Sequence, residues 1–367
     1  MNVSREARAA LARRYPEDYK RIYQSIKDGT PIDEVTVAEW AEQWLEMRKT
    51  QVRPGTWVSD RSAINWIIKT IGSRPLAGLQ PADVRATYEV PIAAGLAITS
   101  ADRIWTVTRL LLRDADEEGY EIPERTMRAR KRPNPAIVDR QALPIDDAKK
   151  ILAVAMKRPD SSRWVAALLQ GMRPAEALGL RWDAIDLNAG TMRIEWQLKR
   201  LFYNEKRNPA SGFRLPHSFE AVHLADAYHL VRPKTASGIR TVPLVPWLRT
   251  ELAAWAAITP ESPHGLVWPA DSGAPKDQTA DRKEWYEITD EAGVKVKRPD
   301  GTMRRPLLYE CRHTAATLLM ANGADEKTLT SIVGHSKITS TKAYLHTDET
   351  RKLAALEAVS AQLGVMS

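Results

Sequence analysis

The chain has 367 residues, of which 43% are hydrophobic and 27% charged, a balance that excludes wholesale disorder. This length exceeds that of a usual single domain, so two folded units with a short extension are expected. Lysine and arginine outnumber aspartate and glutamate by 54 to 46, and the formal charge of +8 favours a polyanionic partner without identifying it.

Cysteine and histidine usage argues against metal and disulfide frameworks. Cys311 is the single cysteine of the sequence, which excludes an internal disulfide and a cysteine-rich zinc module, and we expect a buried thiol. The histidines at 217, 223 and 229 match no common zinc-ligand spacing, so no metal site is predicted. The charged N-terminus and the lack of an apolar run of the roughly 20 residues that a membrane span needs predict a cytoplasmic protein.

A short extension and a small helical domain are predicted before residue 128. Residues 1–35 are charged and lack a clear core, so they are expected to form a helical appendage. Thr36 and Glu39 have the spacing of a capping box and open an all-helical domain over residues 36–127. Apolar residues recur there in three helical stripes: Val37, Trp40, Ala41, Trp44 and Leu45; Ile64, Ile67, Ile68 and Ile71; Ile104, Val107, Leu110 and Leu111. Four tryptophans on helical faces are assigned to the core: Trp40, Trp44, Trp57 and Trp66.

Residues 128–142 are predicted to be a basic linker. They combine clustered arginines and a lysine with Pro133 and Pro135, which favour an extended connector over a helix. Such a run is by itself most often a solvated segment. Between two domains that hold a duplex it would instead contact phosphates.

A mixed domain is predicted over residues 143–350. Helical patterns come first, and alternation at Met192, Ile194, Trp196 and Leu198, repeated over residues 239–244, predicts short strands in a small sheet. Residues 202–230 and 270–305 are rich in proline, glycine and charge, and we interpret them as insertions or long loops. The fold class is therefore α+β and predominantly helical.

The last segment, residues 351–367, has a helical pattern of its own. Leu353, Leu356 and Val359 recur at helical spacing, which would suit an ordinary final helix.

Four residues form an ordered set along the second domain. Arg173 follows a glycine near the start of a predicted helix, and Arg312, His335 and Tyr344 follow far downstream. His335 comes 23 residues after Arg312, and Tyr344 comes 9 residues after His335. In order and spacing this set resembles the active-site pattern of the tyrosine recombinase or phage integrase family.

Three further positions extend the resemblance, which covers about residues 36–350. Lys234 is similar to the lysine that family members carry on a strand turn, and Glu176 to an acidic position three residues after the first arginine. Tyr309 departs from the pattern, because most members have histidine three residues before the second arginine. A phenol relays protons near neutral pH less readily than imidazole does, so a modified general-base arrangement is expected.

The resemblance implies roles that fit the chemistry of these side chains. The non-bridging oxygens of a phosphodiester carry negative charge that grows in the transition state, and the planar forks of Arg173 and Arg312 would stabilise it without a metal. His335 would add a hydrogen-bond donor. Tyr344 would attack phosphorus to give a 3′-phosphotyrosine, and Lys234 would protonate the departing 5′-oxygen. No cofactor is implied.

The function implied is that of a site-specific DNA recombinase of the phage or prophage integrase type, catalysing integration and also excision. Its partners would be double-stranded DNA attachment sites, three further copies of the chain in a tetramer, and an accessory DNA-bending or directionality protein. The resemblance also suggests that residues 351–367, instead of forming an ordinary final helix, are a tail that docks on a neighbouring protomer. The helical domain would hold one face of the duplex and the catalytic domain the other, in a bacterial cytoplasm with the protein on the nucleoid when bound.

Two other classes stay open on sequence alone. A DNA-binding structural or regulatory protein could keep this fold without strand transfer, and Tyr309 motivates that alternative. A type IB topoisomerase would use the same chemistry without site specificity or tetramers. Relaxation of any supercoiled plasmid would favour the topoisomerase.

Overall fold

The computed structural model of the chain describes residues 35–130, 141–205, 207–334 and 349–364. The chain divides into two compact units. The first comprises Met1–Ala136 with Arg214–Phe219, and the second comprises Ile137–Phe213 with Glu220–Ser367. The predicted extension and most of the predicted linker lie outside the described residues. None of the described helices combines the length and apolar character needed to cross a membrane.

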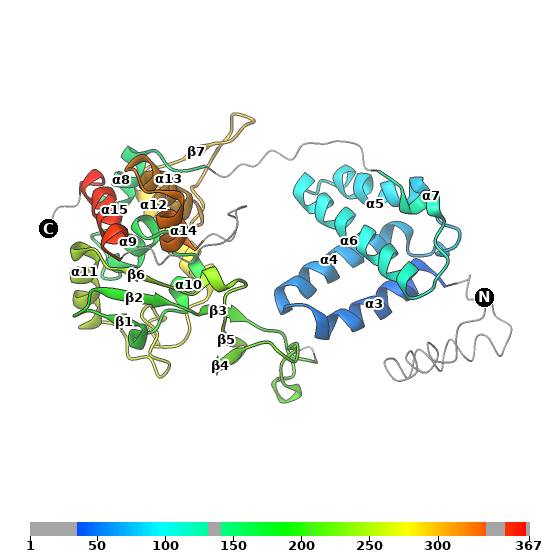
Figure 1. Cartoon of the computed structure of the whole chain (residues 1–367), viewed down its shortest axis with the longest axis horizontal. Helices are drawn as coiled ribbons and strands as arrows, with labels where there is room; N and C mark the ends of the chain where they lie inside the picture. Colours follow the sequence, from blue (N-terminus) through cyan, green and yellow to red (C-terminus); the bar gives the residue numbers. More distant parts are fainter. Residues whose placement is uncertain (1–34, 131–140, 206, 335–348, 365–367) are drawn as a thin grey trace. The chain divides into compact units, whose positions relative to one another are not determined.

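Helices are the regular structure of the first unit in its described part (Figure 1). Its helices are α3 (Val37–Gln51), α4 (Pro54–Ile71), α5 (Pro81–Ala93), α6 (Ile98–Glu117) and α7 (Glu124–Met127). The predicted capping box is confirmed, because the Thr36 hydroxyl accepts from the Glu39 amide and the Glu39 carboxylate accepts from the Thr36 amide, at 3.3 and 2.9 Å. Proline occupies the first position of α4 and α5, where its missing N–H costs nothing.

Buried tryptophans hold the helices of this unit together. Trp40 donates from its indole nitrogen to the Leu111 carbonyl at 2.9 Å, and Trp44 donates to the Asp114 carboxylate at 2.7 Å, so both join α3 to α6. Trp57 is also buried, and Trp66 packs partly buried against the same core. The assignment of these tryptophans to the core is confirmed.

The second unit contains the remaining helices and every described strand. Its helices are α8 (Ile145–Ala155), α9 (Ser161–Leu169), α10 (Pro174–Leu178), α11 (Pro246–Ala256), α12 (Gln278–Glu291), α13 (Glu310–Ala321), α14 (Glu326–Val333) and α15 (Glu349–Gln362). Its strands are β1 (Ile185–Asp186), β2 (Thr191–Ile194), β3 (Gln197–Arg200), β4 (Ala221–Ala225), β5 (Tyr228–Val231), β6 (Arg240–Pro243), β7 (Val296–Lys297) and β8 (Met303–Arg304). The predominantly helical α+β class is confirmed.

The strands form three small antiparallel sheets, ordered β1-β2-β6, β3-β5-β4 and β7-β8. The alternation predicted through Trp196 therefore spans two sheets. Met192 and Ile194 are buried on β2, which pairs with β6, whereas Leu198 is buried on β3, which pairs with β5. The chain leaves the first sheet between Ile194 and Gln197 and returns to it at Arg240.

Both segments interpreted as insertions or long loops contain regular structure, so the long-loop alternative is wrong, while their interpretation as insertions stays a prediction. Residues 202–230 include β4 and most of β5, and residues 270–305 include α12, β7 and β8. In α12 the Asp277 carboxylate caps the first turn by accepting from the Thr279 amide at 2.7 Å, and Trp285 is fully buried. This helix was not predicted because its sequence is rich in charged residues, most of which are exposed on its outer face.

The last described helix packs on its own unit. Leu356 and Val359 of α15 are fully buried, and the Lys352 ammonium donates to the Thr241 carbonyl on β6 at 3.1 Å. Figure 1 shows this helix at the C-terminal end of the colour scale, and it contacts α13 and α14. The structure thus shows the ordinary final helix, and exchange of the tail between protomers stays a prediction.

Candidate active site

Arg173 stands where the sequence predicts, at the N-terminus of a short helix. It is the N-cap of α10, and its amide donates to the Glu176 carboxylate at 3.1 Å. Its guanidinium donates to the same carboxylate at 2.5 Å and to the Gly334 carbonyl at 2.8 Å. These two bonds fix the guanidinium, and because a quarter of the Arg173 side chain is exposed, a ligand can still reach it.

Arg312 lies on α13 and is only 1% exposed. Its Nη1 donates to the Gly171 carbonyl at 2.9 Å. Its Nε and Nη2 are buried and find no hydrogen-bond acceptor among the described residues. Burial, and then the like charge of Arg173, lower the pKa of Arg312 to about 9, so the guanidinium remains protonated at pH 7. A buried cation with two unused donors is suited to an anionic ligand.

A third arginine, Arg240, belongs to the same cluster. It begins β6, is 8% exposed, and donates from Nη2 to the Glu176 carboxylate at 2.9 Å. The sequence analysis gave Arg240 no role. The sequence did contain an indication: Arg240 is two residues before the buried Val242 on the same strand, so both side chains lie on the face that points into the domain.

Glu176 is the carboxylate that these side chains share. It is fully buried, and burial alone would raise its pKa, but Arg240 and Arg173 outweigh that effect and lower it. Glu176 therefore stays ionised. Together with Arg312, the described cluster holds three guanidinium groups against this carboxylate, so positive charge is in excess where Arg312 has unused donors.

Two glycines let the backbone approach the cluster. Gly171 and Gly334 have φ values of 59° and 72°, in the left-handed region that side chains rarely adopt. A Cβ on Gly334 would lie 2.9 Å from Nη1 of Arg240, and one on Gly171 would lie 3.1 Å from the Val333 side chain. Gly334 ends α14 and directly precedes His335 in the sequence. His335 and Tyr344 themselves lie outside the described residues.

Two family models match this chain, and one of them spans the arginine cluster. The model of the phage integrase family matches residues 141–351, more than half of the chain, and that of a phage integrase N-terminal SAM-like domain matches residues 36–89. The chain belongs to the phage integrase family of tyrosine recombinases. Membership makes it an enzyme of site-specific DNA recombination.

Individual relatives are distant but matched over most of their length. An integrase of Saccharopolyspora erythraea is 24% identical over 353 residues, covering 85% of this chain and 78% of the relative. A tyrosine recombinase XerC-like protein of Caldanaerobacter subterraneus subsp. tengcongensis is 22% identical over 359 residues, covering 91% and 86%.

Solved integrase structures share the fold. The integrase of transposon Tn1549, in complex with transposon right end DNA, gives a TM-score of 0.65 at 16% identity and covers 89% of this chain and 99% of its own. A lambda integrase dimer bound to a COC′ core site gives 0.60 at 16% identity, with coverage of 85% and 100%.

Lys234 and Tyr309 are two further residues that the sequence predicts in the recombinase site. Lys234 is exposed in the loop between β5 and β6. Tyr309 caps α13 three residues before Arg312, and its ring meets the His313 ring edge-on with centroids 5.6 Å apart. Cys311 is fully buried, and burial raises the pKa of its thiol, so the expectation of a buried packing residue is confirmed.

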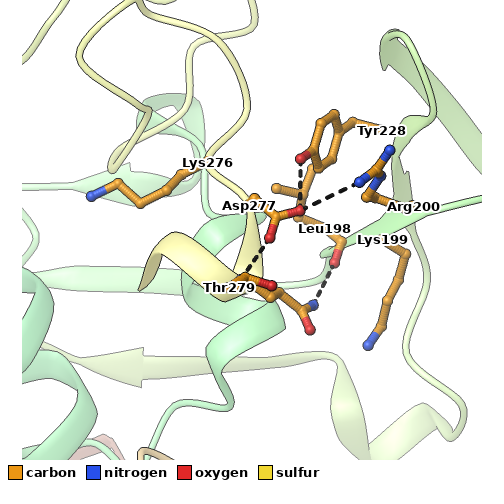
Figure 2. A pocket seen from close by; sticks show the side chains of 8 residues that line it. Leu198, Lys199, Arg200, Tyr228, Lys276, Asp277 and Thr279 are labelled. Atoms are coloured by element: carbon orange, nitrogen blue, oxygen red, sulfur yellow. Dashed lines mark hydrogen bonds and ion pairs between the residues drawn. The ribbon is translucent and has the colours of Figure 1, made fainter. Parts of the chain in front are cut away.

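A separate pocket of about 380 Å³ is lined by none of these recombinase residues. It lies between β3, β5 and the start of α12, and Figure 2 shows the side chains that line it. Asp277 is the carboxylate at its centre in this view. It accepts from the Tyr228 hydroxyl at 2.9 Å and from the Thr279 amide at 2.7 Å, so it serves as a helix cap.

Proposed function

We propose that this recombinase cuts and rejoins DNA through a covalent link to Tyr344. The phenolic oxygen of Tyr344 attacks phosphorus, the bond to the 5′-oxygen breaks, and the DNA 3′ end is left as a phosphotyrosine. Lys234 gives a proton to the departing 5′-oxygen. A 5′-hydroxyl from another strand then attacks the phosphotyrosine, which releases Tyr344 and restores a phosphodiester.

The buried, partly unpaired guanidinium of Arg312 is the observation that carries this proposal. Two donor nitrogens without described acceptors, held in a protein interior, are preorganised for the non-bridging oxygens of a phosphodiester. Arg173 offers a second fork on the open side. Because hydrogen bonds to a growing negative charge strengthen in the transition state, this pair lowers the barrier to cleavage.

Tyr309 replaces the usual histidine in this scheme. It is the N-cap residue of the helix that carries Arg312 and stands three positions before that arginine. A phenol supplies a hydrogen bond but exchanges protons near pH 7 slowly compared with imidazole. Activation of Tyr344 therefore depends mainly on His335 and on the charge of the arginines.

Integration of a phage, prophage or related mobile element is the biological role that we favour. The Saccharopolyspora integrase matches over most of its length, and the Tn1549 and lambda integrases share the fold. A lambda integrase tetramer has been solved on a Holliday junction. By analogy this chain acts as a tetramer on two double-stranded attachment sites, with an accessory bending or directionality protein.

A chromosome-resolving role is the second candidate, because several of the matched relatives are tyrosine recombinases named XerC or XerC-like. The two roles differ in substrate. An integrase joins two dissimilar sites on separate molecules, whereas a resolvase acts on identical sites in one molecule. Plasmid assays with both site arrangements, carried out with purified protein, distinguish them.

The first test uses nicked duplexes tiled from the DNA that flanks the gene, incubated with the protein in EDTA. A nick near the scissile bond lets a short fragment diffuse away and traps the covalent protein–DNA adduct on a denaturing gel. We expect an adduct with one duplex, absent for Tyr344→Phe. Selective binding without any adduct would overturn the recombinase mechanism and favour a regulatory DNA-binding protein.

A further inference from the structure

Arg240 is buried in the cluster but has no part in the chemistry above. Its guanidinium donates from Nη2 to the Glu176 carboxylate at 2.9 Å, from Nε to the Ile332 carbonyl at 2.7 Å and from Nη1 to the Gly238 carbonyl at 3.1 Å. Every nitrogen of the fork is thus committed to the protein. The Arg240 side chain is also only 5% exposed, against 25% for Arg173, so burial and these bonds keep it from a DNA phosphate.

Two of the three partners of Arg240 belong to distant segments that carry or lead to expected catalytic residues, while Gly238 lies in the loop just before Arg240. Glu176 holds the amide and guanidinium of Arg173 at the start of α10. Ile332 lies in the last turn of α14, two residues before Gly334. Arg240 therefore joins the segment that carries Arg173 to the turn after which the chain continues to His335.

The contacts close into a ring. Arg173 donates to Glu176, Glu176 accepts from Arg240, Arg240 donates to the end of α14, and the Gly334 carbonyl at that end accepts from Arg173 at 2.8 Å. Gly334 also packs against the fork, since a Cβ there would lie 2.9 Å from Nη1 and 3.1 Å from Cζ of Arg240. The planar guanidinium of Arg240 can lie this close because Gly334 has no side chain.

We propose that Arg240 is a positioning residue for strand cleavage, one that holds the Gly334 turn against Arg173 and Glu176. This inference rests on the proposed recombinase function and concerns the phosphate-stabilising side of the site. Lysine cannot replace Arg240 fully, because an ammonium lacks the planar fork that reaches several fixed acceptors at once. Arg240 acts through its neighbours and does not contact DNA.

The test compares Arg240→Gln and Arg240→Lys with the wild type on the nicked duplex that forms the adduct. Arg193→Gln is the matched control. Arg193 lies on β2, beside the β2 residue that pairs with Arg240, but its guanidinium is exposed and binds Glu195. We expect single-turnover cleavage to fall about ten- to hundredfold for Arg240→Gln and less for Arg240→Lys, with DNA affinity unchanged.

A substrate with sulfur in place of the bridging 5′-oxygen separates positioning of the arginine side from positioning of Lys234. A thiolate leaves without a proton, so this substrate should restore cleavage by Lys234→Ala. It should leave Arg240→Gln defective, because the phosphate-stabilising side is still displaced. Full rescue of Arg240→Gln would overturn the proposal, because it would show that Arg240 positions Lys234 in the loop between β5 and β6.

Hydrogen exchange without DNA supplies a readout that does not depend on catalysis. Loss of the bond to the Ile332 carbonyl should speed amide exchange over the last turn of α14 in both Arg240 variants, with Arg193→Gln unchanged. Wild-type exchange in these variants, or cleavage equal to that of Arg193→Gln, would overturn the proposal. Failure of the wild type to form an adduct would instead count against the recombinase mechanism, and the exchange result would still stand.

Discussion

Two buried arginines of the second unit show opposite uses of the same side chain. Arg163 on α9 lies 1% exposed against Asp281 on α12, with Nε and Nη2 donating to the two carboxylate oxygens at 3.0 and 2.7 Å. Arg312 on α13 is buried as deeply, yet its Nε and Nη2 have no described acceptor. Nη1 of Arg163 is likewise buried without a described acceptor, but the charge of Arg163 is paired with Asp281, and this pair joins two helices. Arg312 has no ion pair among the described residues, so its charge is left for a ligand.

The difference teaches how to tell a structural charge from a functional one. Moving a charged side chain from water into the protein interior costs on the order of several kcal/mol, and a paired carboxylate offsets much of this cost. At Arg163 the offset comes from the fold itself. At Arg312 it is incomplete in the described protein, which is the state expected of a site that an anion completes.

The largest expected effect follows from removing the uncompensated charge. Arg312→Gln should lower single-turnover cleavage by about 10²- to 10³-fold, because it removes charged donors from the phosphate site. The free energy of unfolding should stay the same or rise, since a buried, partly unpaired cation is gone. Arg305→Gln, which changes a half-exposed arginine, is the control. Substantial destabilisation by Arg312→Gln would show that its charge is structural after all.

Removing the compensating carboxylate should have the reverse consequence. Asp281→Asn leaves the Arg163 cation without its partner and should destabilise the protein by about 3 kcal/mol, measured by urea unfolding. Asp290→Asn on the same helix breaks a half-exposed pair with Arg305 and should cost less than about 1 kcal/mol. Equal effects of the two substitutions would refute the distinction drawn between buried and exposed pairs.

Acid should weaken the arginine cluster through Glu176. Burial opposes ionisation of this carboxyl, but Arg240 and Arg173 prevail and lower its pKa below the unfolded value. The stability that it contributes is therefore present above the unfolded pKa and is lost as the pH falls through the folded pKa. The fall in thermal midpoint on acidification should be shallower for Glu176→Gln than for the wild type. Parallel curves would contradict the coupling.

The smallest effect is expected at Tyr309, at the start of the helix that carries Arg312. Tyr309→His restores the residue that most family members have there, and cleavage should be unchanged or faster by up to about tenfold. Single-turnover rates on the nicked duplex measure this. A large loss would show that the phenol has a role of its own in this chain.

The resemblance to the recombinase family predicted that Arg173, Arg312 and Glu176 share one site, and the structure brings these three residues together. The role of Arg240 was not predicted, because only its position two residues before the buried Val242 in a short strand indicates that it is buried. The pair of Arg163 and Asp281 escaped because the two residues are 118 positions apart, and no local pattern links them.

The fold was predictable where one local pattern dominates. The capping box at Thr36 and the apolar stripes of the first unit set their helices directly. Helix α12 was missed because its apolar residues are few, and its anchors are a buried ion pair and one tryptophan. Strand β4 was missed because none of its residues is buried, and β5 was missed, although His229, Leu230 and Val231 are buried, because it is short and follows a segment rich in proline, glycine and charge.

Peptide mapping of the covalent adduct tests the central claim most directly. The adduct formed on the nicked duplex is digested with nuclease and protease, and the nucleotide-bearing peptide is sequenced by mass spectrometry. The account predicts a single modified residue, Tyr344, with Arg312→Gln giving the same peptide in far lower yield. A nucleotide on Tyr309, or on any residue other than Tyr344, would contradict it.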